Sequence, residues 1–347
     1  MMVKKIDLPA LDLWIAGLIE QYETIGVQAN ADDFIFATLK RASDLRLDYD
    51  VTILPPKMLF QPQWEELLTY TETEGYQSVI DSTPFVIVGV HPYDLVAISQ
   101  MDEIFYQNNP DLRYCSRREN ATIVAVDVQN ISPNTFAGFM GTAYVTEGYD
   151  ILLTRIGEHY LVDAATEKGH AILGSVAQAD DAVDADLDRR RKVWEDNNKR
   201  LRRRELRADP STWGKLLDES YEHPVWDEKA RLCFSCGSCT LVCPTCYCFD
   251  IRDDVGWDLR RAQRSRVWDG CMLRDFTAVA GGLNFRKDVV ARYRHRYYRK
   301  GKYVPDRIGG RIACIGCGRC ITACVANIAN PVEIFNRLAE DRSWKKR

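Results

Sequence analysis

Cysteine is the residue type in this sequence whose number and spacing could do chemistry. The chain has 12 cysteines; only Cys115 lies outside the stretch from Cys233 to Cys324. Two runs share the spacing C-x2-C-x2-C-x3-C, and this spacing is typical of [4Fe–4S] clusters, because three thiolates two residues apart wrap one cubane. The first run is Cys233, Cys236, Cys239 and Cys243, and the second is Cys314, Cys317, Cys320 and Cys324.

The last cysteine of each run predicts crossed ligation. It stands one helical turn beyond the third cysteine and points away from the cubane that the first three hold, so in two-cluster proteins it ligates the other cluster. Gly237 and Gly318 each follow the second cysteine, and we expect them to let the backbone approach an inorganic sulfide closely. Zinc is the alternative, but it commonly takes two pairs of ligands rather than two complete runs of four. The predicted ligand sets are Cys233, Cys236, Cys239 and Cys324 for one cluster, and Cys314, Cys317, Cys320 and Cys243 for the other.

Three further cysteines, Cys246, Cys248 and Cys271, lie close to these runs in the sequence. Cys246 and Cys248 put two thiolates on one extended segment, and Cys271 follows Trp268-Asp269-Gly270. Spacing alone leaves open whether they hold a third cluster, because a fourth ligand is missing. Cys115 is a remote candidate for that ligand, although buried free cysteines are common.

The N-terminal half must help to position these cysteines, and it alternates between helical and strand patterns. A strand–helix–strand alternation at this spacing predicts an α/β domain. We find neither a Gly-rich nucleotide fingerprint nor a phosphate-binding loop. The expected helices are Leu8–Tyr22 and Asp94–Phe105, and the expected strands are Phe85–Val90, Thr122–Val128, Asp150–Ile156 and Tyr160–Asp163.

A highly charged segment, Asp180–Arg207, separates this half from the cysteines. It contains neither glycine nor proline, which favours a long solvated helix with local ion pairs; a docking surface for an acidic partner is the alternative. Ser211 is expected to cap a short helix through Leu217. The predicted fold class is α+β or α/β, with a mixed α/β domain (1–178), a charged helical linker (179–230) and a ferredoxin-like domain with two [4Fe–4S] clusters (231–347).

Composition excludes several classes of protein. The 347 residues are 46% apolar and 28% charged, as in ordinary globular proteins, and a net charge of −4 does not favour nucleic acid as a partner. The first residues lack the apolar stretch of a signal peptide, and no apolar run approaches the roughly 20 residues that span a bilayer. We therefore expect a cytoplasmic protein without membrane insertion.

Longer motifs around the cysteines resemble a known family. The chain is similar to the β subunit of cytoplasmic NiFe hydrogenases of the sulfhydrogenase type, and also to the A subunit of anaerobic sulfite reductase. The resemblance extends over about residues 55–335 and is most specific around the cysteines. The motifs are Cys233–Asp250, Arg266–Cys271, Gly281–Arg286, Arg292–Arg296 and Cys314–Cys320, with weaker ones at Gly89–Leu95, Arg117–Glu119 and Gly148–Leu153.

The resemblance implies an electron-transfer subunit of an oxidoreductase complex, with no active site in this chain itself. One partner would be a flavin-bearing subunit that binds NAD(P), and the others would be the small and large subunits of a NiFe hydrogenase. In the alternative complex, the partner would be the catalytic subunit of a sulfite reductase. A more remote alternative is a non-redox binding protein whose clusters are structural.

The sequence departs from the family at one position. The family usually carries a cysteine in its Gly-Val-x-x-Cys-Asp element, where it joins the third cluster, and Tyr93 stands there in this chain. Tyr93, Asp94, Cys115 or a neighbouring subunit could supply the missing ligand. His91 is interpreted as a structural histidine or a residue beside this cluster. Four arginines near the cysteines are expected to tune cluster potentials or to form ordinary surface contacts. They are Arg286 and Arg294 foremost, with Arg292 and Arg296, and the last three belong to the basic stretch Arg292–Lys300.

Overall fold

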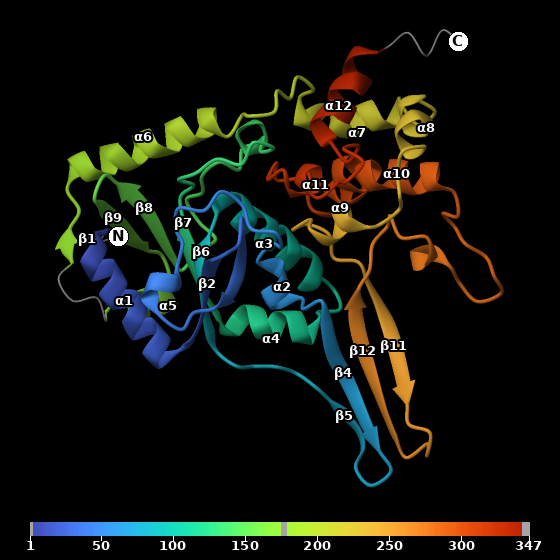
Figure 1. Cartoon of the computed structure of the whole chain (residues 1–347), viewed down its shortest axis with the longest axis horizontal. Coiled ribbons are helices and arrows are strands. Elements are labelled where there is room, and N and C mark those ends of the chain that lie inside the picture. The colour runs from blue at the N-terminus through green and yellow to red at the C-terminus, as the bar shows by residue number, and fades with distance from the viewer. Residues whose placement is uncertain (1–2, 175–178, 342–347) are drawn as a thin grey trace.

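An eight-stranded mixed β-sheet organises the N-terminal half (Figure 1). The structure is a computed structural model that describes residues 3–174 and 179–341. Strands β2, β6, β7 and β8 are parallel neighbours, and the outer pairs are antiparallel. In spatial order the strands are β10 (Asp180–Asp181), β1 (Lys4–Asp7), β9 (His159–Ala164), β8 (Ile151–Ile156), β7 (Ala121–Val126), β6 (Phe85–Val90), β2 (Glu23–Asn30) and β3 (Asp33–Thr38).

Helices of this half pack on the sheet, and local sequence sets their ends. The carboxylate of Asp7 accepts a hydrogen bond from the Ala10 amide (2.8 Å) and so caps the first helix. The indole of Trp14 donates to the carbonyl of Ile172 (2.9 Å), which joins the first helix to the fifth. The predicted helices and strands are all present, so the mixed α/β prediction is confirmed. The helices are α1 (Leu8–Gln21), α2 (Lys57–Phe60), α3 (Pro92–Phe105), α4 (Leu112–Asn120), α5 (Glu167–Leu173) and α6 (Asp184–Arg200).

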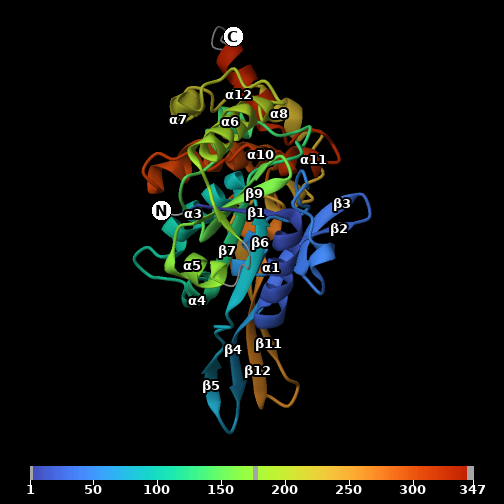
Figure 2. The same ribbon diagram turned by 90° about the vertical axis from the view of Figure 1, so that its left-hand side faces the viewer.

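A second, four-stranded sheet projects from the molecule as an arm (Figures 1 and 2). Two of its strands come from the N-terminal half and two from the cysteine-rich region, an association that the sequence did not predict. At its base, Arg266 and Arg117 both pair with the buried carboxylate of Glu65. In spatial order the strands are β11 (Phe249–Val255), β12 (Arg261–Trp268), β4 (Trp64–Thr71) and β5 (Gly75–Ser78).

Short helices gather the cysteine-rich region around an aromatic core. Trp213 and Phe335 stack with ring centroids 3.6 Å apart, and Trp226 packs against Tyr297 at 5.7 Å. This core is continuous with the partly buried cysteines Cys314 and Cys320 among others. The helices are α7 (Trp213–Asp218), α8 (Val225–Ala230), α9 (Ser238–Leu241), α10 (Val289–Tyr298), α11 (Arg319–Thr322) and α12 (Pro331–Glu340), with a π-helical turn at Arg299–Tyr303 after α10.

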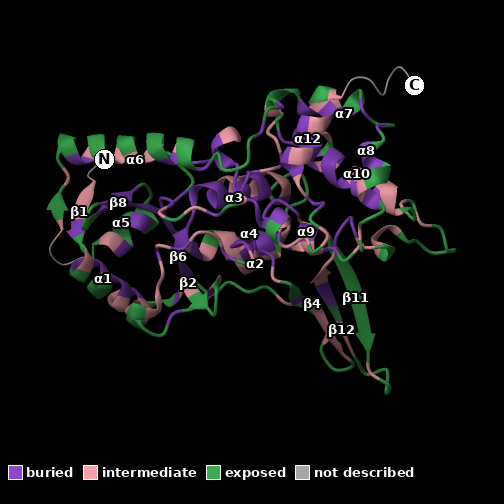
Figure 3. Ribbon diagram, turned by 45° about the horizontal axis from the view of Figure 1, so that its top comes forward, coloured by how far each residue is buried: buried purple, intermediate pink, exposed green. Residues whose placement is uncertain are grey.

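The charged segment forms a shorter helix than predicted. α6 spans Asp184–Arg200 rather than the whole of Asp180–Arg207; its outer face is exposed (Figure 3), whereas Asn197 is buried and donates to the Val128 carbonyl (2.9 Å). The prediction that Ser211 caps the next helix is wrong. Instead, the carboxylate of Asp209 accepts a hydrogen bond from the Ser211 amide (2.9 Å). Asp209 thereby caps the 3₁₀ turn that precedes α7.

Candidate metal centres

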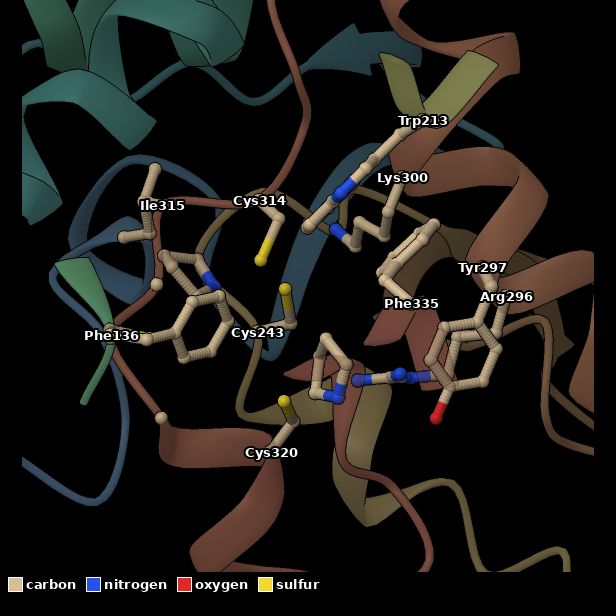
Figure 4. Close-up of a pocket in the computed structure, with 15 residues that line it drawn as sticks. Phe136, Trp213, Cys243, Arg296, Tyr297, Lys300, Cys314, Ile315, Cys320 and Phe335 are labelled. Carbon is tan, nitrogen blue, oxygen red and sulfur yellow. The ribbon is translucent and has the colours of Figure 1, made fainter. Parts of the chain in front are cut away.

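Two cavities in the cysteine-rich region are each lined by four cysteines. Each cavity has three cysteines of one run and the last cysteine of the other, as crossed ligation requires. In Figure 4 the sulfur atoms of Cys243, Cys314 and Cys320 face one another. The Cys243 cavity is lined by Cys243, Cys314, Cys317 and Cys320, and the Cys324 cavity by Cys233, Cys236, Cys239 and Cys324.

A glycine in the left-handed conformation sets the turn of each run. Gly237 (φ 77°) and Gly318 (φ 82°) immediately precede α9 and α11. A Cβ on Gly318 would lie 2.5 Å from the backbone of Asn134, and one on Gly237 would lie 2.9 Å from the side chain of Leu273. Close contact with protein atoms is therefore a second reason for glycine at both positions.

The N-terminal half holds the second run in place through its loop after β7. The Phe136 amide donates to the carbonyl of Gly316 (2.8 Å), and the Thr135 hydroxyl donates to the same carbonyl (3.1 Å). The Thr142 hydroxyl donates to the carbonyl of Ile315 (2.7 Å). The wall of the Cys243 cavity is thus built jointly by the two halves of the chain.

Arg319, directly before Cys320, ties the second run to α3. Its guanidinium donates two hydrogen bonds of 2.7 Å to the carboxylate of Asp94 and one of 2.8 Å to the carbonyl of Thr52. Arg319 is 2% exposed and Asp94 is 0% exposed. Burial opposes the charge on Arg319, but Asp94 and Cys317 together outweigh burial and keep the pKa of Arg319 above its ordinary value.

Two buried cations, Arg296 and Lys300, line the Cys243 cavity (Figure 4). The Lys300 ammonium donates to the hydroxyl of Thr245 (2.6 Å). Burial raises the pKa of Cys314 and of Cys317 to about 12, which disfavours free thiolates there. Burial also opposes the charge of Lys300, but the interactions with Cys243 and Cys246 together outweigh burial and raise the pKa of Lys300.

The donors and their surroundings fit [4Fe–4S] clusters. Cysteine thiolates are the ligands of such clusters, and a four-thiolate cluster carries negative charge that buried cations stabilise. Apolar side chains such as Phe136, Trp213 and Phe335 complete the wall of the Cys243 cavity. Among residues 3–174 and 179–341, no three His, Cys, Asp or Glu side chains are grouped as ligands of a single metal ion.

Comparison with known proteins decides the family. Residues 232–328 match the family model of the 4Fe-4S dicluster domain. The chain is 33% identical over 307 residues to Sulfhydrogenase 2 subunit beta of Pyrococcus furiosus, and this alignment covers 88% of the chain and 89% of that protein. The chain belongs to the sulfhydrogenase β-subunit family. The resemblance predicted from the motifs is confirmed, and no solved structure matched the chain.

The sulfhydrogenase-type chain has a third group of cysteines beside the cavities. Cys246 and Cys271 are buried, and Cys248 is half-buried. A hydrogen bond between Cys246 and Cys243 raises the pKa of the first and lowers that of the second. Burial, together with the charge of Cys248, raises the pKa of Cys271. The third group therefore adjoins the Cys243 cavity.

Buried cations also surround this third group. Lys57 is 3% exposed; its ammonium donates to the carbonyl of Cys246 (2.6 Å) and lies 4.1 Å from the ring centroid of Trp268. Burial lowers the pKa of Lys57 to about 8, opposed by the thiolate charges nearby. The charges of Arg299 and Lys300 act on the same cysteines. In the described ranges, none of these cations forms an ion pair with a carboxylate, and cysteines are the main groups whose negative charge would stabilise them.

The three candidates for the fourth ligand are engaged with other groups. The hydroxyl of Tyr93 lies 2.6 Å from Nδ1 of His91 and donates to the carbonyl of Asp50 (3.1 Å). Burial raises the pKa of Tyr93 well above its ordinary value, which disfavours the phenolate. Asp94 is held by Arg319, and the sulfur of Cys115 lies 3.9 Å from the carbonyl of Phe105.

His91 lies at the N-terminal cap position of α3, and the choice between its two interpretations stays open. It is 0% exposed, and its ring stacks on that of Tyr49 with centroids 3.9 Å apart. Burial lowers the pKa of His91 well below its ordinary value, so the imidazole is neutral.

The basic residues expected to tune the clusters are placed unequally. The guanidinium of Arg294 lies 3.7 Å from the ring centroid of Tyr221 and donates to its carbonyl (3.0 Å). Neither Arg294 nor Arg286 lines either cavity, and their tuning role remains a prediction.

Lys300 was not predicted from the sequence as a residue of the site, although its four-residue spacing from Arg296 puts both side chains on one helix face. Nothing in the sequence pattern marks the buried Lys57 or Arg319.

In the part of the chain that the structure describes, no helix has both the length and the apolar character to cross a membrane.

Proposed function

We propose that this chain is the iron–sulfur electron-transfer subunit of a NiFe-hydrogenase complex. It would stand between a flavin-bearing, NAD(P)H-oxidising subunit and the small and large hydrogenase subunits, in the cytoplasm. The observation that carries this proposal is the pair of adjacent cavities, each lined by four cysteines of crossed origin. The relative named Sulfhydrogenase 2 subunit beta supports the choice of a hydrogenase.

The two cavities are proposed to hold one [4Fe–4S] cluster each. When bound, such clusters accept and release single electrons. The chain's own residues supply the thiolate ligands, exclude water with apolar walls and stabilise negative charge with buried cations. The proposed ligands are Cys233, Cys236, Cys239 and Cys324 in one cavity, and Cys314, Cys317, Cys320 and Cys243 in the other.

We propose a third cluster on Cys246, Cys248 and Cys271. Its support is the buried cations around these thiols, led by Lys57, since unpaired buried cations are costly without a nearby anion. Tyr93, Asp94 and Cys115 have other partners in the structure, so we assign the fourth ligand to a group outside this chain.

Co-purification tests the proposed partners. The chain is isolated anaerobically from its native cells, and the bound subunits are identified by mass spectrometry and metal analysis. A nickel-containing large subunit together with a flavoprotein is expected. A sirohaem protein in their place would move the chain to a sulfite reductase-type complex.

A redox experiment separates electron transfer from a purely structural role. Reduction of the purified chain by dithionite is expected to give paramagnetic signals from interacting clusters. Metal centres that stay silent on reduction would favour a non-redox binding protein.

A further inference from the structure

Helix α10 forms part of the wall of both cavities. Tyr293 lines the Cys324 cavity, whereas Arg296 and Tyr297 line the Cys243 cavity. Lys300, in the π-helical turn that continues α10, also lines the Cys243 cavity. Positions three, four and seven residues apart share a helix face, so a single face of this segment meets both sets of cysteines.

Arg296 is the arginine of this face, and its charge has no carboxylate partner among the described residues. It is 2% exposed, and in the described ranges its Nε and Nη1 groups donate to no hydrogen-bond partner and no carboxylate pairs with it. The two other arginines that are 2% exposed differ, since Arg319 pairs with Asp94 and Arg266 with Glu65. A buried guanidinium without a counter-charge is strongly unfavourable, so we expect a counter-anion within its reach.

The cysteines within reach of Arg296 belong to both cavities. Its guanidinium projects into the Cys243 cavity toward Cys243 and Cys320 in Figure 4. It also acts on Cys239, which lines the Cys324 cavity. The charge of Lys300 acts on Cys243 and Cys246 instead, so Lys300 stabilises negative charge at the Cys243 cavity.

We propose that Arg296 is a shared positioning residue, the common counter-charge of the cysteine ligands in both cavities. This inference rests on the proposed function, because it assumes a cluster in each cavity. A cation stabilises the more negative, reduced state of a cluster, so removal of the cation lowers the reduction potential. Loss of the Arg296 charge therefore lowers the potentials of both cavities. Loss of the Lys300 charge lowers the potential of the Cys243 cavity, and of the third cluster beside it, but not that of the Cys324 cavity.

The test is a redox titration followed by electron paramagnetic resonance on the full chain purified anaerobically. Arg296→Gln and Arg296→Met each shift the midpoint potentials of both cavities to more negative values, whereas Lys300→Gln leaves the potential of the Cys324 cavity unchanged. Arg294→Gln is the matched control, because this arginine lies on the same helix but contacts Tyr221 and lines neither cavity. It leaves both potentials unchanged, which also tests the tuning role predicted for it from the sequence.

Three results would overturn the inference: a shift of only one potential in both neutral Arg296 variants, no shift in either, or an equal shift in Arg294→Gln. If neither neutral variant retains iron, Arg296→Lys decides. Iron content and potentials near those of the native chain support the counter-charge, and loss of iron from this variant too contradicts it. Absence of reducible clusters in the native chain would instead overturn the proposed function.

Discussion

The guanidinium of Arg319 and the carboxylate of Asp94 form a buried ion pair with two hydrogen bonds of 2.7 Å. Arg319 belongs to the second cysteine run, and Asp94 belongs to the first turn of α3 in the N-terminal sheet domain. The pair therefore fixes a cluster-binding loop to an element that lies 225 residues away in the sequence.

Substitution of Asp94 by alanine leaves the Arg319 charge buried and unpaired. We expect Asp94→Ala to destabilise the chain by about 3–5 kcal/mol, as removal of one partner from a buried pair does. The measurement is anaerobic chemical denaturation. Asp253→Ala, which breaks the exposed pair with Arg264, is the control and should leave the midpoint unchanged. Equal effects of the two substitutions would show that the buried pair has no special role.

Crossed ligation predicts which serine variants behave alike. Cys243→Ser should alter the same paramagnetic signal as Cys314→Ser, although Cys243 belongs to the other run. Cys239→Ser should alter the other signal. Cys115→Ser is the control. It should leave both signals intact, because the sulfur of Cys115 contacts the Phe105 carbonyl and lines neither cavity. If Cys243→Ser behaves like Cys239→Ser, each run holds its own cluster and ligation is not crossed.

The third group of cysteines predicts an iron content above that of a two-cluster protein. The chain purified anaerobically should contain about twelve irons, and Cys246→Ser should reduce this to about eight. Tyr93→Phe should retain the full content, because the Tyr93 hydroxyl is bonded to His91 and Asp50. About eight irons in the native chain would rule out the third cluster, and a loss of iron in Tyr93→Phe would make the tyrosine its ligand.

Asp127 predicts a dependence of stability on pH. Burial raises its pKa from 3.8 to about 6, against hydrogen bonds from Thr154 (2.6 Å) and Trp194 (2.9 Å). Between these two pKa values the folded chain keeps a proton that the unfolded chain releases, so the free energy of unfolding falls as pH rises and stays low above about pH 6.

Replacement of Asp127 by asparagine removes this titration and keeps an oxygen acceptor for Thr154 and Trp194. Near neutral pH we expect Asp127→Asn to be more stable than the native chain, by on the order of 3 kcal/mol, and the difference should shrink toward pH 4. Denaturation midpoints across this range measure it. Asp196→Asn, at an exposed position of α6, serves as control. A constant difference at every pH would assign the effect to packing.

Short-range patterns predicted much of this molecule. The buried strand Phe85–Val90, the amphipathic helix starting at Leu8 and the two cysteine runs each carry their signal in a few neighbouring residues. The pairing of β4 with β12 joins Trp64–Thr71 to Arg261–Trp268, and neither strand encodes its partner. Charged side chains such as Lys57 and Arg319 were missed for the same reason, because their burial depends on thiols and carboxylates remote in sequence.

The most direct test of the account is a reductive titration of the chain purified anaerobically, monitored by electron paramagnetic resonance. Iron and acid-labile sulfide are determined on the same sample. We predict at least about eight irons with matching sulfide, and signals on dithionite reduction that are broadened by coupling between neighbouring [4Fe–4S] clusters. A chain that binds zinc without sulfide and gives no signal on reduction would contradict the account.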